Sequence, residues 1–226
     1  MFSVMLAIYW AGIFVVTHIP VPNWARNMGM NDKTMHFVAY MLFAFLLWFA
    51  VGFDEKVNWR KFKPWLILVI VLLYGVVDEV LQRFVGRGMD GFDFAANAGG
   101  VTVAMLTVTL LSGRRAIIVP AMVCPVLIPG LVRAGIITRG TIYEFAVYFI
   151  CFVVVSLILG LTLKNKFVGL LAAAADVVSL KIYAGLTDKV MGKEAMLFAF
   201  ISVVITFGVL FYVERVKRVA DEDKLP

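Results

Sequence analysis

Residues 65–77 read WLILVIVLLYGVV and are followed at once by two acids, Asp78 and Glu79. This run belongs to a mostly apolar stretch, 64–82, that is long enough to cross the roughly 30 Å hydrocarbon core of a bilayer as a helix. Comparable stretches recur along the chain, and we predict eight spans, at residues 2–19, 34–53, 64–82, 94–112, 116–132, 142–163, 167–186 and 195–213. The sequence therefore predicts an all-α, polytopic membrane bundle, because a helix satisfies its backbone hydrogen bonds without water.

The composition of the 226-residue chain excludes a soluble enzyme. Hydrophobic residues make up 62% of it and charged residues 16%, against about 45–50% and 25% in soluble domains. Cys124 and Cys151 lie inside apolar stretches and are interpreted as buried hydrophobes, not as disulfide partners or zinc ligands. The net charge of +6 does not indicate nucleic acid, because Lys and Arg are spread over short loops without interleaved aromatic residues.

The distribution of Lys and Arg indicates the orientation of the chain. With the N-terminus inside, twelve of the 21 basic residues lie on the inner side and nine on the outer side, which favours a cytoplasmic N-terminus. The fifth span contains Pro120, Pro125 and Pro129 and is expected to be kinked or re-entrant, since each proline removes a helix donor. Asp176 lies well inside the seventh span, and an acid at that depth is a functional candidate.

Polar residues gather at the ends of the first four predicted spans. The first span ends at His18, the second begins near Asp32, the third ends with Glu79, and the fourth opens at Asp93. Successive spans alternate in direction, so these four ends lie at one face of the membrane. Each such group would cost on the order of 2.5–3.5 kcal/mol if it faced lipid near the bilayer centre. We therefore expect a shared polar funnel, open at the extracytoplasmic face when the N-terminus is inside.

Helical spacing and chemistry assign roles to these residues. Acids that crowd a histidine can supply both a proton donor and a proton acceptor, and Arg or Lys can bind an anionic head group. The predicted catalytic residues are His36, Glu79, Asp32 and Asp93. The predicted substrate-binding residues are Lys33, Arg83, Arg87, Asp90, Gln82, Asn97, Tyr40 and His18.

Two other interpretations of the cluster remain open. The acids and bases can simply neutralise one another and hold the helix ends together, and such buried ion pairs need not add much stability. A divalent metal is the one cofactor considered, although the two histidines come from different spans and match no known metal-binding spacing. The metal-ligand candidates are His18, His36, Asp90 and Asp93.

Four motifs occur in order along the first half of the chain. They are His18-x-Pro20, Asp32-Lys33-x-x-His36, Glu79-x-x-Gln82 and Arg87-x-x-Asp90-x-x-Asp93-x-x-x-Asn97. With them, residues 1–112 resemble the VanZ-like membrane proteins. The resemblance implies an integral protein of the bacterial cell membrane with a cell-envelope role, whose founding relatives are linked to reduced susceptibility to the glycopeptide teicoplanin. Residues 113–226 lie outside it and are expected to form an additional bundle of about four helices with a short cytoplasmic tail.

The expected function is to recognise or modify a lipid-linked or cell-wall precursor at the outer face. A hydrolase or transferase reaction at an ester or phosphoester bond would use the cluster, with membrane lipids and the precursor as partners. A transporter or flippase is the first alternative, weakly favoured by the repeated pentamer MLFAF at 41–45 and 196–200. A structural or regulatory membrane partner is the second.

Overall fold

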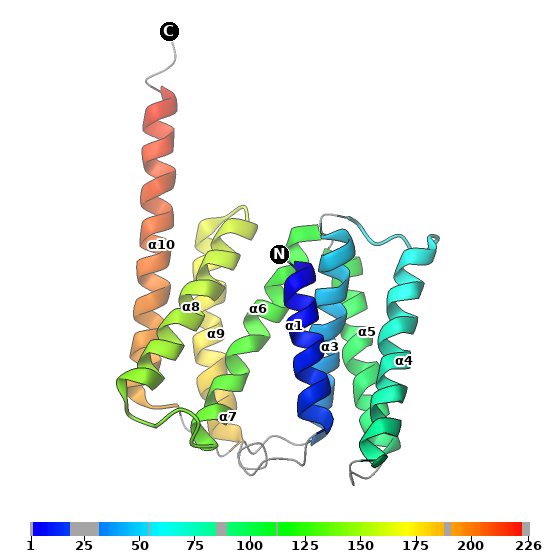
Figure 1. Cartoon of the computed structure of the whole chain (residues 1–226). Coiled ribbons are helices and arrows are strands. Elements are labelled where there is room, and N and C mark those ends of the chain that lie inside the picture. Colours follow the sequence, from blue (N-terminus) through cyan, green and yellow to red (C-terminus); the bar gives the residue numbers. More distant parts are fainter. Residues whose placement is uncertain are drawn as a thin grey trace. The chain divides into compact units, whose positions relative to one another are not determined.

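The computed structural model describes residues 2–18, 32–53, 55–84, 90–111, 113–187 and 191–222 (Figure 1). Within these ranges every regular element is a helix, and seven helical segments are long and apolar enough to cross a membrane. The predicted all-α, polytopic membrane bundle is confirmed. The first predicted span is α1 (Phe2–His18), an apolar helix of 17 residues that is shorter than the other seven.

Two compact units make up the chain, Met1–Ala116 and Ile117–Pro226. The N-terminal unit contains α1, α3 (Asp32–Gly52), α4 (Phe62–Phe84) and α5 (Gly91–Leu111). The central helix is α3, which packs against the other three. Its aromatic residues Tyr40, Phe43, Phe45 and Trp48 are almost fully buried.

The sequence of α4 shows why the polar residues face inward. Pro64 stands in its first turn, where a missing N–H group costs no hydrogen bond. Its buried residues recur every three or four positions, which is the spacing of one helix face. They are Pro64, Ile67, Val71, Gly75, Asp78, Glu79 and Gln82. Exposed valines and leucines cover the rest of the helix, as a lipid-facing surface requires.

The fifth predicted span is a broken helix. It consists of the short 3-10 helix η1 (Gly113–Ile117), α6 (Ile118–Val123), η2 (Cys124–Val126) and α7 (Leu127–Arg133). The η2 turn contains Pro125, so the break lies where a proline removes a backbone donor. The kink that the prolines predicted is therefore present at the middle of the segment.

The rest of the C-terminal unit is formed by α8 (Ile142–Thr162), α9 (Lys166–Leu186) and α10 (Lys193–Glu222). The side chain of Asn165 caps α9 by accepting hydrogen bonds from the backbone N–H groups of Phe167 and Val168. Phe152, Leu159 and Phe207 pack in a shared apolar core.

The last helix is longer than the predicted span of 195–213. It has 30 residues and continues past the ends of α8 and α9 (Figure 1). An ion pair one turn apart, between Glu214 and Arg218 at 2.9 Å, lies in this extension. The helix thus persists where the apolar sequence ends.

Candidate functional site

The end of α1, the start of α3, the end of α4 and the start of α5 meet in the N-terminal unit. Asp78 of α4 is fully buried at this junction. Its carboxylate accepts hydrogen bonds from Thr17 Oγ1 at 2.7 Å, from Gln82 Nε2 at 3.0 Å and from Tyr40 OH at 3.3 Å. His18 Nδ1 lies 3.7 Å from the same carboxylate. Asp78 therefore ties α1 and α3 to α4 and has its hydrogen-bonding capacity satisfied.

The neighbouring residue, Glu79, lies in a different environment. It is 3% exposed, and no side chain donates a hydrogen bond to either carboxylate oxygen, although the backbone N–H group of Asp90 faces it. Its Oε1 atom is 3.7 Å from His36 Nδ1, which also faces Asn97 Oδ1 at 3.1 Å. A buried acid that lacks side-chain donors is costly for stability, so its presence beside a histidine points to a use other than holding the fold.

Lys33, Asp90 and Asp93 form another part of the cluster. The Lys33 ammonium donates hydrogen bonds to Asp90 and, at 2.5 Å, to Asp93 Oδ1. The hydrogen bond from Lys33 holds the pKa of Asp90 below its usual value, assisted by the backbone N–H of Phe92. An anion-binding role for Lys33 stays a prediction, and it would require the ammonium to leave these two carboxylates.

One ligand atom from each of Asp32, His36 and Asp93 lies within 4.8 Å of the other two. His36 and Asp93 are buried, whereas the Asp32 side chain is 47% exposed. His36 Nε2 is 4.0 Å from Asp32 Oδ1, which is beyond hydrogen-bonding distance. Among the described residues this trio is the group with spacing suited to a metal ion, and it includes two of the four predicted ligands.

The remaining predicted residues divide into three groups. Tyr40, Gln82 and His18 lie around Asp78. Arg83 is exposed at the end of α4, and no ion pair or hydrogen bond of its side chain is found within the described ranges. Arg87 and Pro20 lie outside the described residues.

Two residues at the centre of the cluster, Thr17 and Asp78, were not among the site residues predicted from the sequence. Thr17 donates the shortest of the three hydrogen bonds to Asp78, and Asp78 joins three helices. The available signal was the position of Thr17 beside His18 at the end of the first span. A hydroxyl at that depth needs an acceptor, and the carbonyl of Ile13, 2.9 Å from Thr17 Oγ1, is the alternative acceptor for the same proton.

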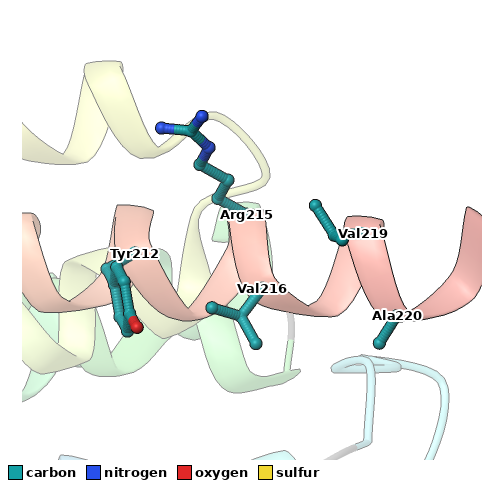
Figure 2. A pocket seen from close by; sticks show the side chains of 5 residues that line it. All are labelled: Tyr212, Arg215, Val216, Val219 and Ala220. Carbon is teal, nitrogen blue, oxygen red and sulfur yellow. The ribbon is translucent and has the colours of Figure 1, made fainter.

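Two buried acids of the C-terminal unit, Glu144 and Asp176, lie on different helices. Glu144 is buried at the start of α8 and accepts from the backbone N–H of Gly140 at 2.6 Å. Asp176 is 8% exposed near the middle of α9, and its Oδ2 atom has no partner. Figure 2 shows an open pocket along α10, lined by Tyr212, Arg215, Val216, Val219 and Ala220. All five come from one helix, so this pocket does not enclose a ligand.

Comparison of the chain with known protein families, curated proteins and solved structures found no match. The resemblance to the VanZ-like proteins therefore stays a prediction from the four motifs.

Proposed function

We propose that the N-terminal unit binds and modifies the polar head of a membrane lipid or of a lipid-linked cell-envelope precursor. The cluster lies at helix ends, where we expect lipid head groups to meet water. The proposed reaction is hydrolysis or group transfer at an ester or phosphoester bond. Glu79 and His36 would exchange the proton, while Asp32 and Asp93 orient the histidine or hold a cation.

The observation that carries this proposal is the contrast between two consecutive acids. Asp78 has three hydrogen-bond donors, as a structural group should. Glu79 has no side-chain donor, although it is equally enclosed and lies 3.7 Å from the His36 ring. If the cluster served only to hold helices together, donors would be expected at both carboxylates.

Lipid analysis of cells tests the proposal. The full chain is expressed in a bacterial host, and membrane lipids and lipid-linked precursors are compared by mass spectrometry with those of the same host carrying His36→Gln or Glu79→Gln. The matched control is Glu144→Gln, which neutralises a buried acid of the C-terminal unit. We expect a changed lipid or precursor with the wild type and with the control, and its loss in both site variants at equal membrane levels. Identical profiles in all strains would contradict the proposal.

The glycopeptide role that the resemblance implies gives a second readout in the same strains. Modification of a precursor at the outer face would alter access of teicoplanin to its target. We expect the wild type and Glu144→Gln to lower teicoplanin susceptibility, and His36→Gln to restore it. Equal susceptibility in all strains would mean that this protein does not have the glycopeptide role of the family.

A lipid carrier is the second candidate, favoured by Asp176. The Oδ2 atom of Asp176 has no hydrogen-bond partner, and an acid near the middle of a spanning helix is typical of proton-coupled transport. In sealed vesicles that contain a fluorescent phospholipid, a carrier would move the lipid between leaflets without forming a new product, and Asp176→Asn would stop this movement. A new lipid product formed by purified protein in detergent would favour the enzyme.

A further inference from the structure

We propose that Asp32, His36 and Asp93 bind a divalent transition-metal ion of the zinc or manganese class. Their ligand atoms lie within 4.8 Å of one another, whereas ligands of one such ion are about 3.0–3.5 Å apart for metal–ligand bonds of roughly 2.0–2.2 Å. The side chains would rotate toward one another to bind the ion. Asp32 and His36 are one turn apart on α3, and Asp93 comes from the first turn of α5.

The contacts of His36 leave its Nε2 atom facing the proposed ion position. Nδ1 faces two acceptors, Asn97 Oδ1 at 3.1 Å and Glu79 Oε1 at 3.7 Å, so the ring proton belongs on Nδ1. Nε2 then carries a lone pair, and it faces the Asp32 carboxylate at 4.0 Å. Two electron-rich groups facing each other without a proton between them are accommodated by a cation that both can bind.

Glu79 provides an independent indication of a ligand. It is buried, both of its oxygens lack side-chain donors, and it faces the ring nitrogen opposite to the proposed ion. Histidines that bind metals donate their other ring N–H group to a carboxylate or carbonyl, which fixes the tautomer and raises the basicity of the ligand. A bound ion would make the Nδ1–H group of His36 a stronger donor toward Asn97 and Glu79.

The charge balance also favours a cation. Five carboxylates, those of Asp32, Asp78, Glu79, Asp90 and Asp93, lie in the cluster, and among the described residues one ammonium, from Lys33, contacts them. Lys33 engages Asp90 and Asp93, so one ammonium is shared between two of these acids. The exposure of the Asp32 side chain, 47%, gives an ion a path from water.

The ligand set selects the class of ion. One imidazole with two carboxylates suits zinc or manganese, whereas magnesium prefers oxygen ligands alone. Three protein ligands leave a position for water, as in catalytic sites. Here the inference deepens the proposed function, because a bound ion would activate that water for hydrolysis while Glu79 orients the His36 ring through its Nδ1–H group. Binding of the ion does not itself depend on the proposed function.

The test measures metal in the purified full-length protein without any lipid substrate. The protein is stripped with chelator, loaded with Zn²⁺, Mn²⁺ or Mg²⁺, and desalted; bound metal is determined by mass spectrometry and affinity by calorimetry. We expect about one Zn²⁺ or Mn²⁺ per chain and weaker Mg²⁺ binding. His36→Gln and Asp93→Asn should abolish binding, and Glu79→Gln should weaken it about 10–100-fold, as loss of an outer carboxylate does.

Two further variants separate a metal site from a purely structural cluster. Lys33→Met removes the competing ammonium beside Asp93 and should raise metal affinity severalfold, an effect that simple loss of folding cannot produce. Glu144→Gln should bind like the wild type. Three results would each overturn the inference. They are no bound ion in the wild type, equal metal content in the wild type and His36→Gln, and equal loss of metal in Glu144→Gln. Metal binding that depends on His36 in a protein without lipid activity would leave the inference standing and remove the proposed function.

Discussion

Gly100 of α5 lies so close to Phe37 of α3 that a Cβ atom at position 100 would stand 2.2 Å from the Phe37 carbonyl oxygen. The same approach of the two helices brings Asn97, one turn earlier on α5, within 3.1 Å of His36. Small residues allow backbones to approach in this way in membrane helices. The geometry around His36 therefore depends on a glycine that itself touches no reactive group.

The first prediction concerns this contact. Gly100→Ala should destabilise the protein by about 1–3 kcal/mol, because the added methyl group meets backbone atoms that cannot rotate away. Gly99→Ala is the matched control, since its Cβ atom would meet a ring carbon of Phe37 at an ordinary 3.4 Å. Thermal unfolding in detergent measures both variants. Equal melting temperatures for the two would contradict the close packing of α3 on α5.

The second prediction concerns Asp78. Asp78→Asn places an amide donor among three groups that already donate, and should cost about 1–3 kcal/mol of stability. Tyr40→Phe removes the longest of these hydrogen bonds, at 3.3 Å, and should cost less. Thermal unfolding compares the two variants. A larger loss for Tyr40→Phe than for Asp78→Asn would exclude Asp78 as the centre of the network.

The third prediction is that neutralising Glu79, unlike neutralising Asp78, does not destabilise the protein. Glu79→Gln replaces a buried carboxylate that lacks side-chain donors with a neutral group, which lowers the cost of burial. The variant should therefore unfold at or above the melting temperature of the wild-type protein, while losing lipid modification. Functional residues commonly show this trade between stability and activity. A drop in melting temperature as large as that of Asp78→Asn would mean that Glu79 is structural.

The fourth prediction is a pH dependence at the other end of the N-terminal unit. Lys63 donates to Glu55 Oε2 at 2.8 Å and holds the pKa of Glu55 below its usual value. A lowered pKa contributes stability above the unfolded value of about 4.3, and this contribution is lost as the pH falls through the folded value. Glu55→Gln should thus slightly lower the melting temperature at pH 7, and this difference should shrink as the pH falls through the lowered pKa of Glu55.

The Glu55 effect should be small and sensitive to salt, because the carboxylate is largely exposed. Thermal unfolding of the wild type and Glu55→Gln at low and high ionic strength provides the check. A difference between the two proteins that persists unchanged at pH 3.5 would rule out the Lys63 pair as its source.

Much of the fold could be predicted from sequence because hydropathy and helix periodicity act locally. The buried stripe of α4, for instance, follows directly from its spacing. By contrast, the sequence does not predict which of the two consecutive acids, Asp78 or Glu79, receives hydrogen bonds from neighbouring side chains. Consecutive helical residues point about 100° apart, and the rotation of the helix depends on neighbours such as Thr17 and Tyr40. The outward position of Arg83 has the same cause.

The extension of α10 marks another limit of sequence reasoning. Hydropathy indicates where a span leaves the hydrocarbon, near residue 213, but it does not indicate where the helix ends. Glu214 and Arg218 pair along the same helix and support it beyond the apolar segment.

The most direct test of the account asks whether the cluster lies at one face of the membrane. Single-cysteine proteins lacking Cys124 and Cys151 would carry Thr34→Cys or Phe92→Cys near the cluster, or Asn58→Cys or Lys61→Cys at the opposite end. All four positions are exposed. They are labelled in intact cells with a membrane-impermeant maleimide.

We predict that the proteins with Thr34→Cys and Phe92→Cys react in intact cells, and that those with Asn58→Cys and Lys61→Cys react only after lysis. The reverse pattern would place the cluster at the cytoplasmic face and contradict its proposed outer location. Labelling of Thr34→Cys and Phe92→Cys from opposite sides would contradict the shared site itself.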